Sequence, residues 1–569
     1  MDASVAAPFG LNSADRIRHL AYVEALAKCL NVELAEALNK FHGVSNSPRF
    51  WEILLGHWLK RCVMVLFNRY FTVEQTLANS PPLETIVFDS KNYSLSTNDS
   101  IEFIWACGDD EWNHVLYKEI FEFLGVDKIS FSSGPPIEDK DFSTSKGAPV
   151  AIRLNAKKVV LAVANFFLPK LSRERDALII NTYLSLFQEA GLQLLLGQCP
   201  QIWRTPALEM TALDQKSRQD LSIDVFGIEG FEKFVRLLVT KMLPRCYLEG
   251  YAALLEKAEQ LPWPKKPRFI FASNRFDTDE VFKAWVAKKV GFGTPYFAGQ
   301  HGNNYGTHLW LTTETWPERS SSDRFITWGK WVGAKGANAP AFVFRNVGKK
   351  VGQFDPAGGI LLIENLLFHR LDVGDIYHGY SAYQEAQFRF VESLPVHIHS
   401  RLTVRLHRDF KRLGWADDIR WKDRSPSTFV EKGVLPINAL IGRSRLVVHS
   451  YDSTGTLETL ALNIPTLCFW WNSLEDVLPV MRPYYEVLKN AGILIESPEV
   501  AAQFVKERWD DIGHWWANEV VQTARGVFCE QFALSNKTPV RTLRDLLCKL
   551  ESECQQNNGT SKLYIEAST

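Results

Sequence analysis

Apolar residues in the first 70 positions recur at helical spacing. Residues 13–43 repeat them three and four positions apart, and residues 47–70 begin with Ser-Pro and keep the same period, which predicts two helices. From about residue 85, short β-rich runs alternate with amphipathic segments. This alternation predicts parallel sheets covered by helices on both faces.

Seven runs in the first half are expected to be strands: 84–88, 101–106, 176–183, 192–197, 268–273, 294–299 and 324–328. Helices are expected between them at 112–125, 230–243 and 278–291. A stretch rich in Gly and Ala follows near 333–358. Beyond it the alternation restarts, with strands near 359–368, 402–407, 445–450 and 464–470 and helices at 380–394, 501–520 and 539–553.

The pattern predicts an α/β chain with two Rossmann-like domains that face each other across a cleft. A chain of 569 residues is too long for one hydrophobic core. The expected divisions are an N-terminal helical extension, a first Rossmann-like domain on the acceptor side, a linker, a nucleotide-binding Rossmann-like domain and a flexible tail, at 1–75, 76–340, 341–358, 359–552 and 553–569.

Composition narrows the class of protein. Lys and Arg number 64 and Asp and Glu 65, so the net charge is −1 and no global attraction to nucleic acid is expected. The nine Cys are scattered and are expected to be reduced thiols in the cytoplasm. Neither a secretory signal nor an apolar run of the ~20 residues needed for a membrane helix is recognisable. We therefore expect a cytoplasmic protein, at most peripheral to the inner membrane.

The most informative segment is 445–470. A β-run ends at Ser450, and a turn of hydroxyl groups and glycine precedes a helix. Backbone N–H groups and the positive end of a helix dipole suit a phosphate. A phosphate contact is expected at the turn, and a ribose contact at the acid in the following helix, that is, at Ser450, Ser453, Thr454, Gly455, Thr456 and Glu458. A plain helix capped by Ser453 or Thr454 is equally compatible with the turn alone.

Two basic residues lie near the end of the strand predicted at 402–407. Arg405 and His407 alternate with Leu406, so both are expected on one face of the strand. Opposite the phosphate turn they could clamp the phosphate of a donor. A solvated sheet edge is the alternative.

A second polar group follows two strands of the first half. Asn274 and Asp277 come after 268–273, and Gln300, His301, Gly302 and Asn303 come after 294–299. Polar side chains in a glycine-punctuated loop are costly to bury without a task. An imidazole of ordinary pKa, ~6.5, suits proton transfer at neutral pH. His301, Gln300 and Asp277 are therefore the catalytic candidates, and Asn274, Gly302 and Asn303 are candidate sugar contacts. A core histidine is the alternative for His301.

Two acidic clusters have capping as the simpler interpretation. Asp277 and Asp279 form a D-x-D triplet, but the triplet lies where a helix must begin, so no metal site is expected. Asp110, Asn113 and His114 gather at another helix start. They are candidate contacts to sugar or acceptor, although capping by Asp109 or Asp110 is favoured.

Five segments together resemble a family of bacterial transferases from surface-polysaccharide and nonulosonic-acid gene clusters. These are FWEILLGHWL, DDEWNH, GQHGNNYG, DRFITWGKW and VRLH with HSYDSTGTLETLALNIPTL, and the resemblance extends from about residue 45 to 550. The layout is more distantly similar to GT-B transferases of capsule, lipopolysaccharide and O-antigen synthesis that use CMP-Kdo.

The resemblance implies a GT-B-like fold, a CMP-activated ulosonic or nonulosonic (Kdo-like or sialic-acid-like) donor, and a cell-envelope glycan or lipid-linked glycan as acceptor. His407 would sit where relatives use a His-Pro pair, yet Arg408 follows it here. Asp277 is the candidate for the acidic side chain that forms a covalent sugar adduct in the relatives. No metal and no cofactor beyond the nucleotide-sugar is implied, and the anomeric outcome and the oligomeric state stay open.

Two alternatives remain at this point. One is a UDP-sugar transferase or epimerase on the same fold. The other is a non-catalytic glycan-binding or assembly protein.

Overall fold

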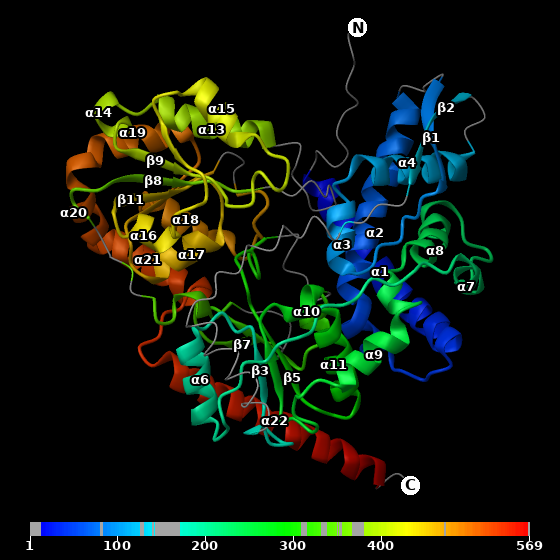
Figure 1. Cartoon of the computed structure of the whole chain (residues 1–569). Helices are drawn as coiled ribbons and strands as arrows, with labels where there is room; N and C mark the ends of the chain where they lie inside the picture. The colour runs from blue at the N-terminus through cyan, green and yellow to red at the C-terminus, as the bar shows by residue number, and fades with distance from the viewer. Residues whose placement is uncertain are drawn as a thin grey trace, which may run out of the picture.

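A computed structural model describes residues 13–79, 84–125, 130–138, 142, 171–308, 316–331, 338–349, 351, 355–366, 380–470 and 474–566. It contains two large, fully parallel sheets with helices around them, which confirms the predicted α/β class (Figure 1). The first sheet has the order β3-β4-β5-β6-β7, with bounds Leu178–Ile180, Ile270–Ala272, Tyr296–Gly299, Arg324–Thr327 and Asn338–Pro340.

The second sheet has the order β10-β9-β8-β11-β12-β13, with β8 at Gly359–Ile363, β9 at Leu402–Arg405, β10 at Phe429–Glu431, β11 at Ser444–His449, β12 at Thr466–Phe469 and β13 at Leu494–Ile495. Its chain leaves β8 for β9 on one side and reaches β11 on the other. The carboxyl ends of β8 and β11 therefore form the switch point at which such sheets bind ligands. Its helices are α13 (Tyr380–Glu392), α14 (Val396–His399), α15 (Asp417–Arg424), α16 (Ile437–Ile441), α17 (Thr454–Ala461), α18 (Arg482–Asn490), α19 (Pro498–Arg508) and α20 (Ile512–Ala517).

The two predicted N-terminal helices are present, but the second is no peripheral extension. α2 (Pro48–Asn79) is buried along most of its length and packs against α1 (Ser13–His42), α4 (Asp110–Leu124), α8 (Gly230–Met242) and α11 (Glu280–Gly291). A helix that is apolar nearly all round is expected in a core. Pro48 begins it, where a missing N–H costs nothing. The domain boundaries remain predictions.

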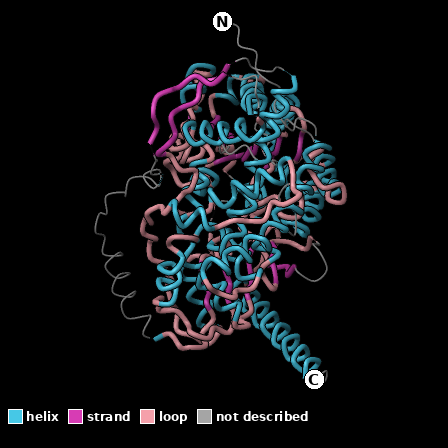
Figure 2. Tube along the Cα trace, turned by 90° about the vertical axis from the view of Figure 1, so that its right-hand side faces the viewer, coloured by secondary structure: helices cyan, strands magenta, loops and turns pink. Residues whose placement is uncertain are grey.

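A small separate sheet and several helices complete the first half. β1 (Glu84–Asn92) pairs in parallel with β2 (Ser130–Glu138), and α4 packs on β1. The tube view shows this pair as two strands lying side by side (Figure 2). The remaining helices are α6 (Leu186–Leu195), α7 (Gln215–Asp220), α9 (Tyr251–Glu259), α10 (Arg275–Thr278) and α12 (Pro317–Ser320).

Two predicted strands are helices instead. Residues 101–106 lie in α3 (Ser100–Ala106): the Asp99 side chain accepts from Glu102 N, and the Glu102 side chain accepts from Asn98 N. This reciprocal capping overrides the β-rich composition of the segment. Residues 192–197 lie in and after α6, which ends before Gly197 with φ of 78°. A glycine there is a typical helix stop.

The end of the chain returns to the first sheet. α21 (Glu519–Phe532) follows the second sheet, and then Leu534 N donates to Trp328 O (2.8 Å) while Leu534 O accepts from Val343 N (2.9 Å). α22 (Pro539–Glu566) packs on α6, and Arg268 pairs with Glu551 in it. The helix extends into the predicted tail, and residues 567–569 lie outside the described part.

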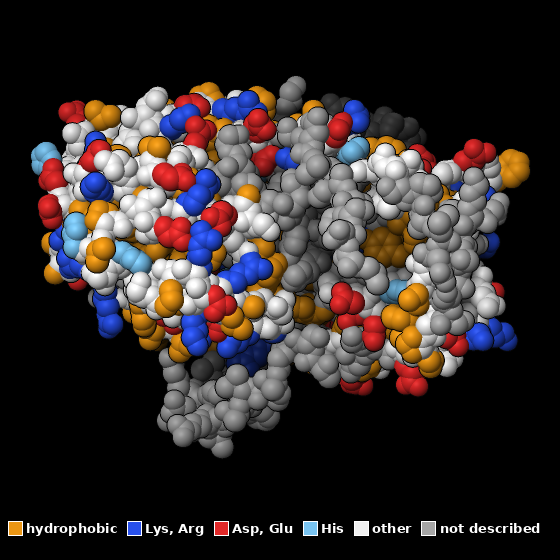
Figure 3. Space-filling view, turned by 90° about the horizontal axis from the view of Figure 1, so that it is seen from above, with side chains coloured by type: hydrophobic (Ala, Val, Ile, Leu, Met, Phe, Trp, Pro, Cys, Tyr) orange, Lys and Arg blue, Asp and Glu red, His pale blue; other side chains and the backbone are white. Residues whose placement is uncertain are grey.

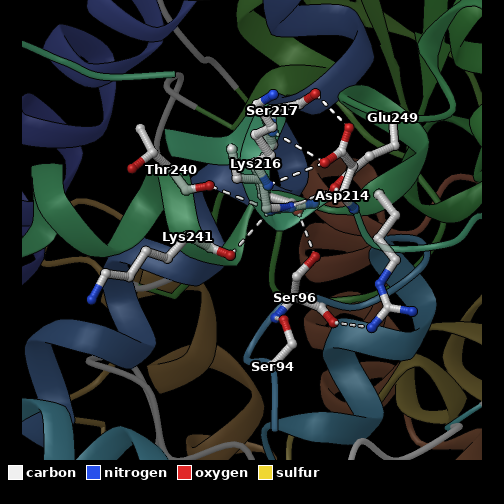
Figure 4. A network of polar contacts seen from close by, with 11 residues as sticks. Ser94, Ser96, Asp214, Lys216, Ser217, Thr240, Lys241 and Glu249 are labelled. Atoms are coloured by element: carbon white, nitrogen blue, oxygen red, sulfur yellow. Dashed lines mark hydrogen bonds and ion pairs between the residues drawn. The ribbon is translucent and has the colours of Figure 1, made fainter. Parts of the chain in front are cut away.

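A buried ion pair anchors a turn beside α8. Arg218 bonds Glu249 through two nitrogens (2.6 and 2.8 Å), and its NH1 group also donates to the carbonyls of Thr240 and Lys241 at the end of α8. Asp214 caps α7 by accepting from Lys216 N and Ser217 N, as Figure 4 shows. The network is structural, since each group satisfies a helix end.

Charges of both signs are interspersed on the face seen from above (Figure 3), which agrees with the balanced composition. Within the described residues, no helix is both long and apolar enough to cross a bilayer.

The first half also encloses a buried ion pair. Lys283 Nζ lies 2.7 Å from Glu280 Oε2 and donates to Tyr247 OH (2.8 Å), while Glu280 Oε1 accepts from Ser100 N (3.1 Å). These contacts join α11 to α3 and to the turn before α9.

Replacing Lys283 tests how much this ion pair contributes to the stability of the fold. Lys283→Met leaves the Glu280 carboxylate buried without its counter-ion, which should lower the free energy of unfolding by about 3–5 kcal/mol. Urea unfolding measures the loss. The exposed Lys506→Met is the control, and equal midpoints for both variants would contradict the assignment.

Candidate functional site

The loop after β5 carries the predicted His301. It turns sharply at Gly306, whose φ is 74° and whose missing side chain leaves room for the Trp331 ring; a Cβ would lie 2.3 Å from that ring. A non-glycine residue here would be both strained and blocked. Tyr305, directly before this turn, lies edge-on against His301, with 5.3 Å between the ring centroids.

A chain of hydrogen bonds leads from this loop to α2. His301 Nδ1 lies 3.0 Å from Tyr305 OH, Tyr305 OH lies 2.7 Å from Glu318 Oε1, and Glu318 Oε2 lies 2.8 Å from His57 Nε2. Tyr305, Glu318 and His57 are buried. Two segments, α2 and the loop after β5, thus converge on one carboxylate of α12.

The order of donors in this chain fixes the tautomer of His301. Burial disfavours the charged carboxylate, but hydrogen bonds from His57 and Tyr305 outweigh it and lower the pKa of Glu318 to about 2. An ionised carboxylate can only accept, so Tyr305 donates to it and its oxygen accepts from Nδ1–H of His301. Burial lowers the pKa of His301, against the opposing charges of Glu318 and Asp277. The ring is then neutral, with a bare lone pair on Nε2.

Asp277 lies beside this chain, on α10 after β4. Its carboxylate pairs with Arg61 of α2 at 2.6 Å. Burial acts to raise the pKa of Asp277, but Arg61 and His57 outweigh it and hold that pKa well below its usual value. Asp277 is therefore ionised. The predicted cap next to it is confirmed, because the Asp279 side chain accepts from Phe282 N at the start of α11.

Gln300 makes its side-chain contacts inside the protein. Its side chain is buried, donates to Gly302 O (2.8 Å) and accepts from Trp328 N (2.9 Å). The first bond closes the loop on itself, and the second ties it to the residue after β6. The structure thus places Gln300 as a support for the His301 loop, which disagrees with the catalytic role expected of it.

The phosphate-type turn is present at the carboxyl end of β11. Ser453 caps α17 by accepting from Thr456 N (3.1 Å). The N–H groups of Thr454 and Gly455 make no hydrogen bond within the part of the chain that the structure describes. Both N–H groups lie at the start of a helix, a position that favours the binding of a phosphate.

Gly455 is also required for packing. A Cβ at this position would lie 2.7 Å from Cε1 of His449, which is buried and whose pKa burial lowers to about 3. A Gly455→Val substitution would therefore disturb the packing of the fold as well as any phosphate site.

The two halves meet at this turn. Asn303 N donates to Thr454 Oγ1 (3.0 Å), and Asn303 Nδ2 donates to Asp452 Oδ1 (2.7 Å). The other oxygen of Asp452 lies 2.8 Å from His308 Nε2 and 2.7 Å from Tyr485 OH. The His301 loop is thus held directly against the turn at 452–455, as the predicted cleft between two sheets requires.

Several predicted donor contacts are occupied by protein groups. Arg405 pairs with Glu431 (2.6 Å), so it is not free to clamp a phosphate. Glu458 pairs with Arg345 and Lys349 rather than facing a ribose. Two buried hydroxyl groups also make contacts within the fold. Ser450 Oγ lies 3.0 Å from Tyr383 OH, and Thr456 Oγ1 lies 3.2 Å from Ser453 Oγ. His407 is exposed beyond β9.

The group near residue 110 is a helix start, as the capping interpretation holds. Asp109 caps α4, and Asp110 is exposed. Asn113 donates to Cys107 O (2.9 Å) and accepts from Arg69. His114 stacks on Phe88 at 4.1 Å between ring centroids, and no contact joins it to the His301 cluster. Asn274, by contrast, lines a hollow of ≈ 450 Å³ at the ends of β3 and β4, next to Asp277.

Sequence reasoning missed His57, Arg61, Tyr305 and Glu318. They lie on helices or turns whose periodicity predicts only packing. For Glu318 the sequence does hold a signal. Trp-Pro-Glu at 316–318 places a Pro at the start of a short helix, and this Pro fixes the backbone conformation directly before Glu318.

Within the described residues, no group of three or more His, Cys, Asp or Glu side chains could hold a metal ion.

Comparison with known families settles what kind of protein this is. The family model described as "LIC12162 family transferase" matches residues 2–547. The chain belongs to this family. It is thus a transferase. No curated protein sequence matches the chain.

Among solved structures, similar chains include MurG of Acinetobacter baumannii, at 11% identity over 66% of this chain and 99% of that one, with a TM-score of 0.34. The spinosyn rhamnosyltransferase SpnG bound to thymidine diphosphate is similar at 12% identity over 52% of this chain and 80% of that one, with a TM-score of 0.28.

The acidity of Glu318 makes stability depend on pH. Its folded pKa, about 2, lies below the ordinary ~4.3. The carboxylate therefore stabilises the fold fully above the unfolded pKa, and this contribution is lost as the pH falls through about 2.

Glu318→Gln should thus cost about 3 kcal/mol of unfolding free energy at pH 6 and progressively less toward pH 3. Urea unfolding at both pH values measures the gap between parent and variant. The exposed Glu74→Gln serves as control. A gap that does not change with pH would show that Glu318 is not ionised in the fold.

Proposed function

We propose that this protein is a metal-independent glycosyltransferase of the GT-B type. It moves a 3-deoxy ulosonic or nonulosonic acid from a CMP-activated donor to a cell-envelope glycan. The observation that carries the proposal is the contact of Asn303 with Thr454 (3.0 Å), because it joins the His301 loop to the helix start that suits a phosphate.

The donor phosphate is assigned to the start of α17. The N–H groups of Thr454 and Gly455 and the helix dipole would stabilise the negative charge that grows on the leaving CMP. Hydroxyl groups of Ser453 and Thr454 border the same position. A CMP leaving group has a single phosphate, so the charge is met without a bridging metal ion.

His301 is assigned as the general base. Its Nε2 lone pair takes the proton from the acceptor hydroxyl as the acceptor oxygen bonds the anomeric carbon, and the bond from that carbon to the CMP oxygen breaks. Glu318 and Tyr305 stabilise the imidazolium and keep Nε2 turned away from them. Ionised Asp277 lies on the same side, where it could stabilise positive charge on the sugar or form an adduct.

The first test separates catalysis from folding. His301→Ala should reduce turnover by about 10²–10⁴-fold with little change in melting temperature, because the ring donates only one part-buried hydrogen bond, from Nδ1 to Tyr305 OH. His114→Ala is the matched control and should retain turnover. A large melting loss with normal turnover per folded molecule would make His301 structural.

The second test concerns the donor. Melting is measured with CMP and with UDP, each with and without EDTA. CMP at about 100 times its dissociation constant should add about 2.7 kcal/mol of stability, UDP less, and EDTA should change neither.

A larger shift with UDP would favour a UDP-sugar enzyme. No shift with either nucleotide would favour a non-catalytic glycan-binding protein. A shift that needs a divalent metal would overturn metal independence.

A further inference from the structure

The amino end of the first sheet carries a basic hollow that the transfer reaction does not use. It measures ≈ 790 Å³ and is bordered by the segments before β3 and β4, by the α11–β5 loop and by α22. In Figure 1 these elements lie at the bottom of the first half, at the opposite end of the strands from the His301 loop. Its cationic lining residues are Arg175, Lys265, Lys266, Arg268 and Lys289.

Acidic groups compensate only part of this charge. Arg268 pairs with Glu551, and Lys266 pairs with Glu174 at 3.3 Å. Arg175, Lys265 and Lys289 have no acidic partner within 4.0 Å among the described residues. The hollow therefore has an excess of positive charge.

Lys289 lies against the segment that carries Lys265, because its Nζ donates to the backbone carbonyl oxygen of Lys265 (2.8 Å). Burial, and the neighbouring charges of Lys288 and Lys265, lower the pKa of Lys289, against the pull of Glu259. The positive charges of Lys288 and Lys265 thus act unfavourably on Lys289, and a bound anion would offset that repulsion.

An apolar side chain stands at the rim. Phe292 is 77% exposed and follows Gly291 in the α11–β5 loop, before Gly293, whose φ is 86°. An exposed phenyl ring would not contribute to the binding of a free anion. A lipid surface uses both features, since phosphate headgroups attract the cations and the ring enters the interface below them.

We propose that this hollow and Phe292 dock the protein on an anionic lipid membrane. The proposal does not depend on the sugar or nucleotide that the enzyme uses. The cleft would then face away from the bilayer, because it lies at the carboxyl ends of the same strands.

The test is co-sedimentation of the full chain with vesicles of phosphatidylcholine, with and without phosphatidylglycerol. Binding is expected only with the anionic lipid and should fall between 50 and 500 mM NaCl, as screening shortens the reach of the charges. Arg175→Glu with Lys265→Glu should weaken partitioning by about tenfold or more, and Phe292→Ser should weaken it less.

Two variants serve as matched controls. Phe226 is 93% exposed in another turn, and Lys506 is an exposed cation elsewhere. Phe226→Ser and Lys506→Glu should bind vesicles as the parent does, and melting temperatures confirm that all variants fold.

Absence of binding to anionic vesicles, or equal binding by parent and charge variant, overturns the proposal. So does a melting shift by inorganic pyrophosphate that the charge variant loses while vesicles stay unbound, because the hollow would then be a site for a free anion.

Discussion

The carboxylate of Asp452 holds together the two halves on which the site depends. It accepts from Asn303 on one oxygen and from Tyr485 on the other, with His308 at 2.8 Å from that second oxygen. A buried carboxylate is costly unless its lone pairs are all used, so these partners have little freedom. The positions of the His301 loop and of the start of α17 are thereby fixed relative to each other.

A second constraint sets the chemistry of His301. Glu318 takes a proton donor on each oxygen, and the direction of the bond from Tyr305 determines which nitrogen of His301 is bare. The cost of burying this carboxylate is offset by α2, which supplies His57 and, through Arg61, also balances Asp277. α2 therefore stabilises the charged groups around His301, although it lies outside the first sheet.

The sequence predicted the sheets better than the site. Buried apolar runs and a capped turn are local signals, so β4, β5, β11 and the start of α17 could be located from them. Glu318 and His57 are 261 positions apart, and no local pattern links them. Gln300 shows the opposite error: a polar residue in a glycine-punctuated loop suggested a catalytic role, yet its side chain bonds to Gly302 and Trp328 inside the protein.

The path of the chain between the halves has a mechanical meaning. The chain leaves the first sheet near Val343 and comes back at Leu534, and these two residues are hydrogen-bonded to each other (2.9 Å). The second sheet is therefore an insertion within the first half, tethered by two adjacent strands of backbone. Because these two tethers are neighbours, rotation of the second sheet is the motion they restrict least, and contacts such as that of Asn303 with Asp452 would have to break for it to occur.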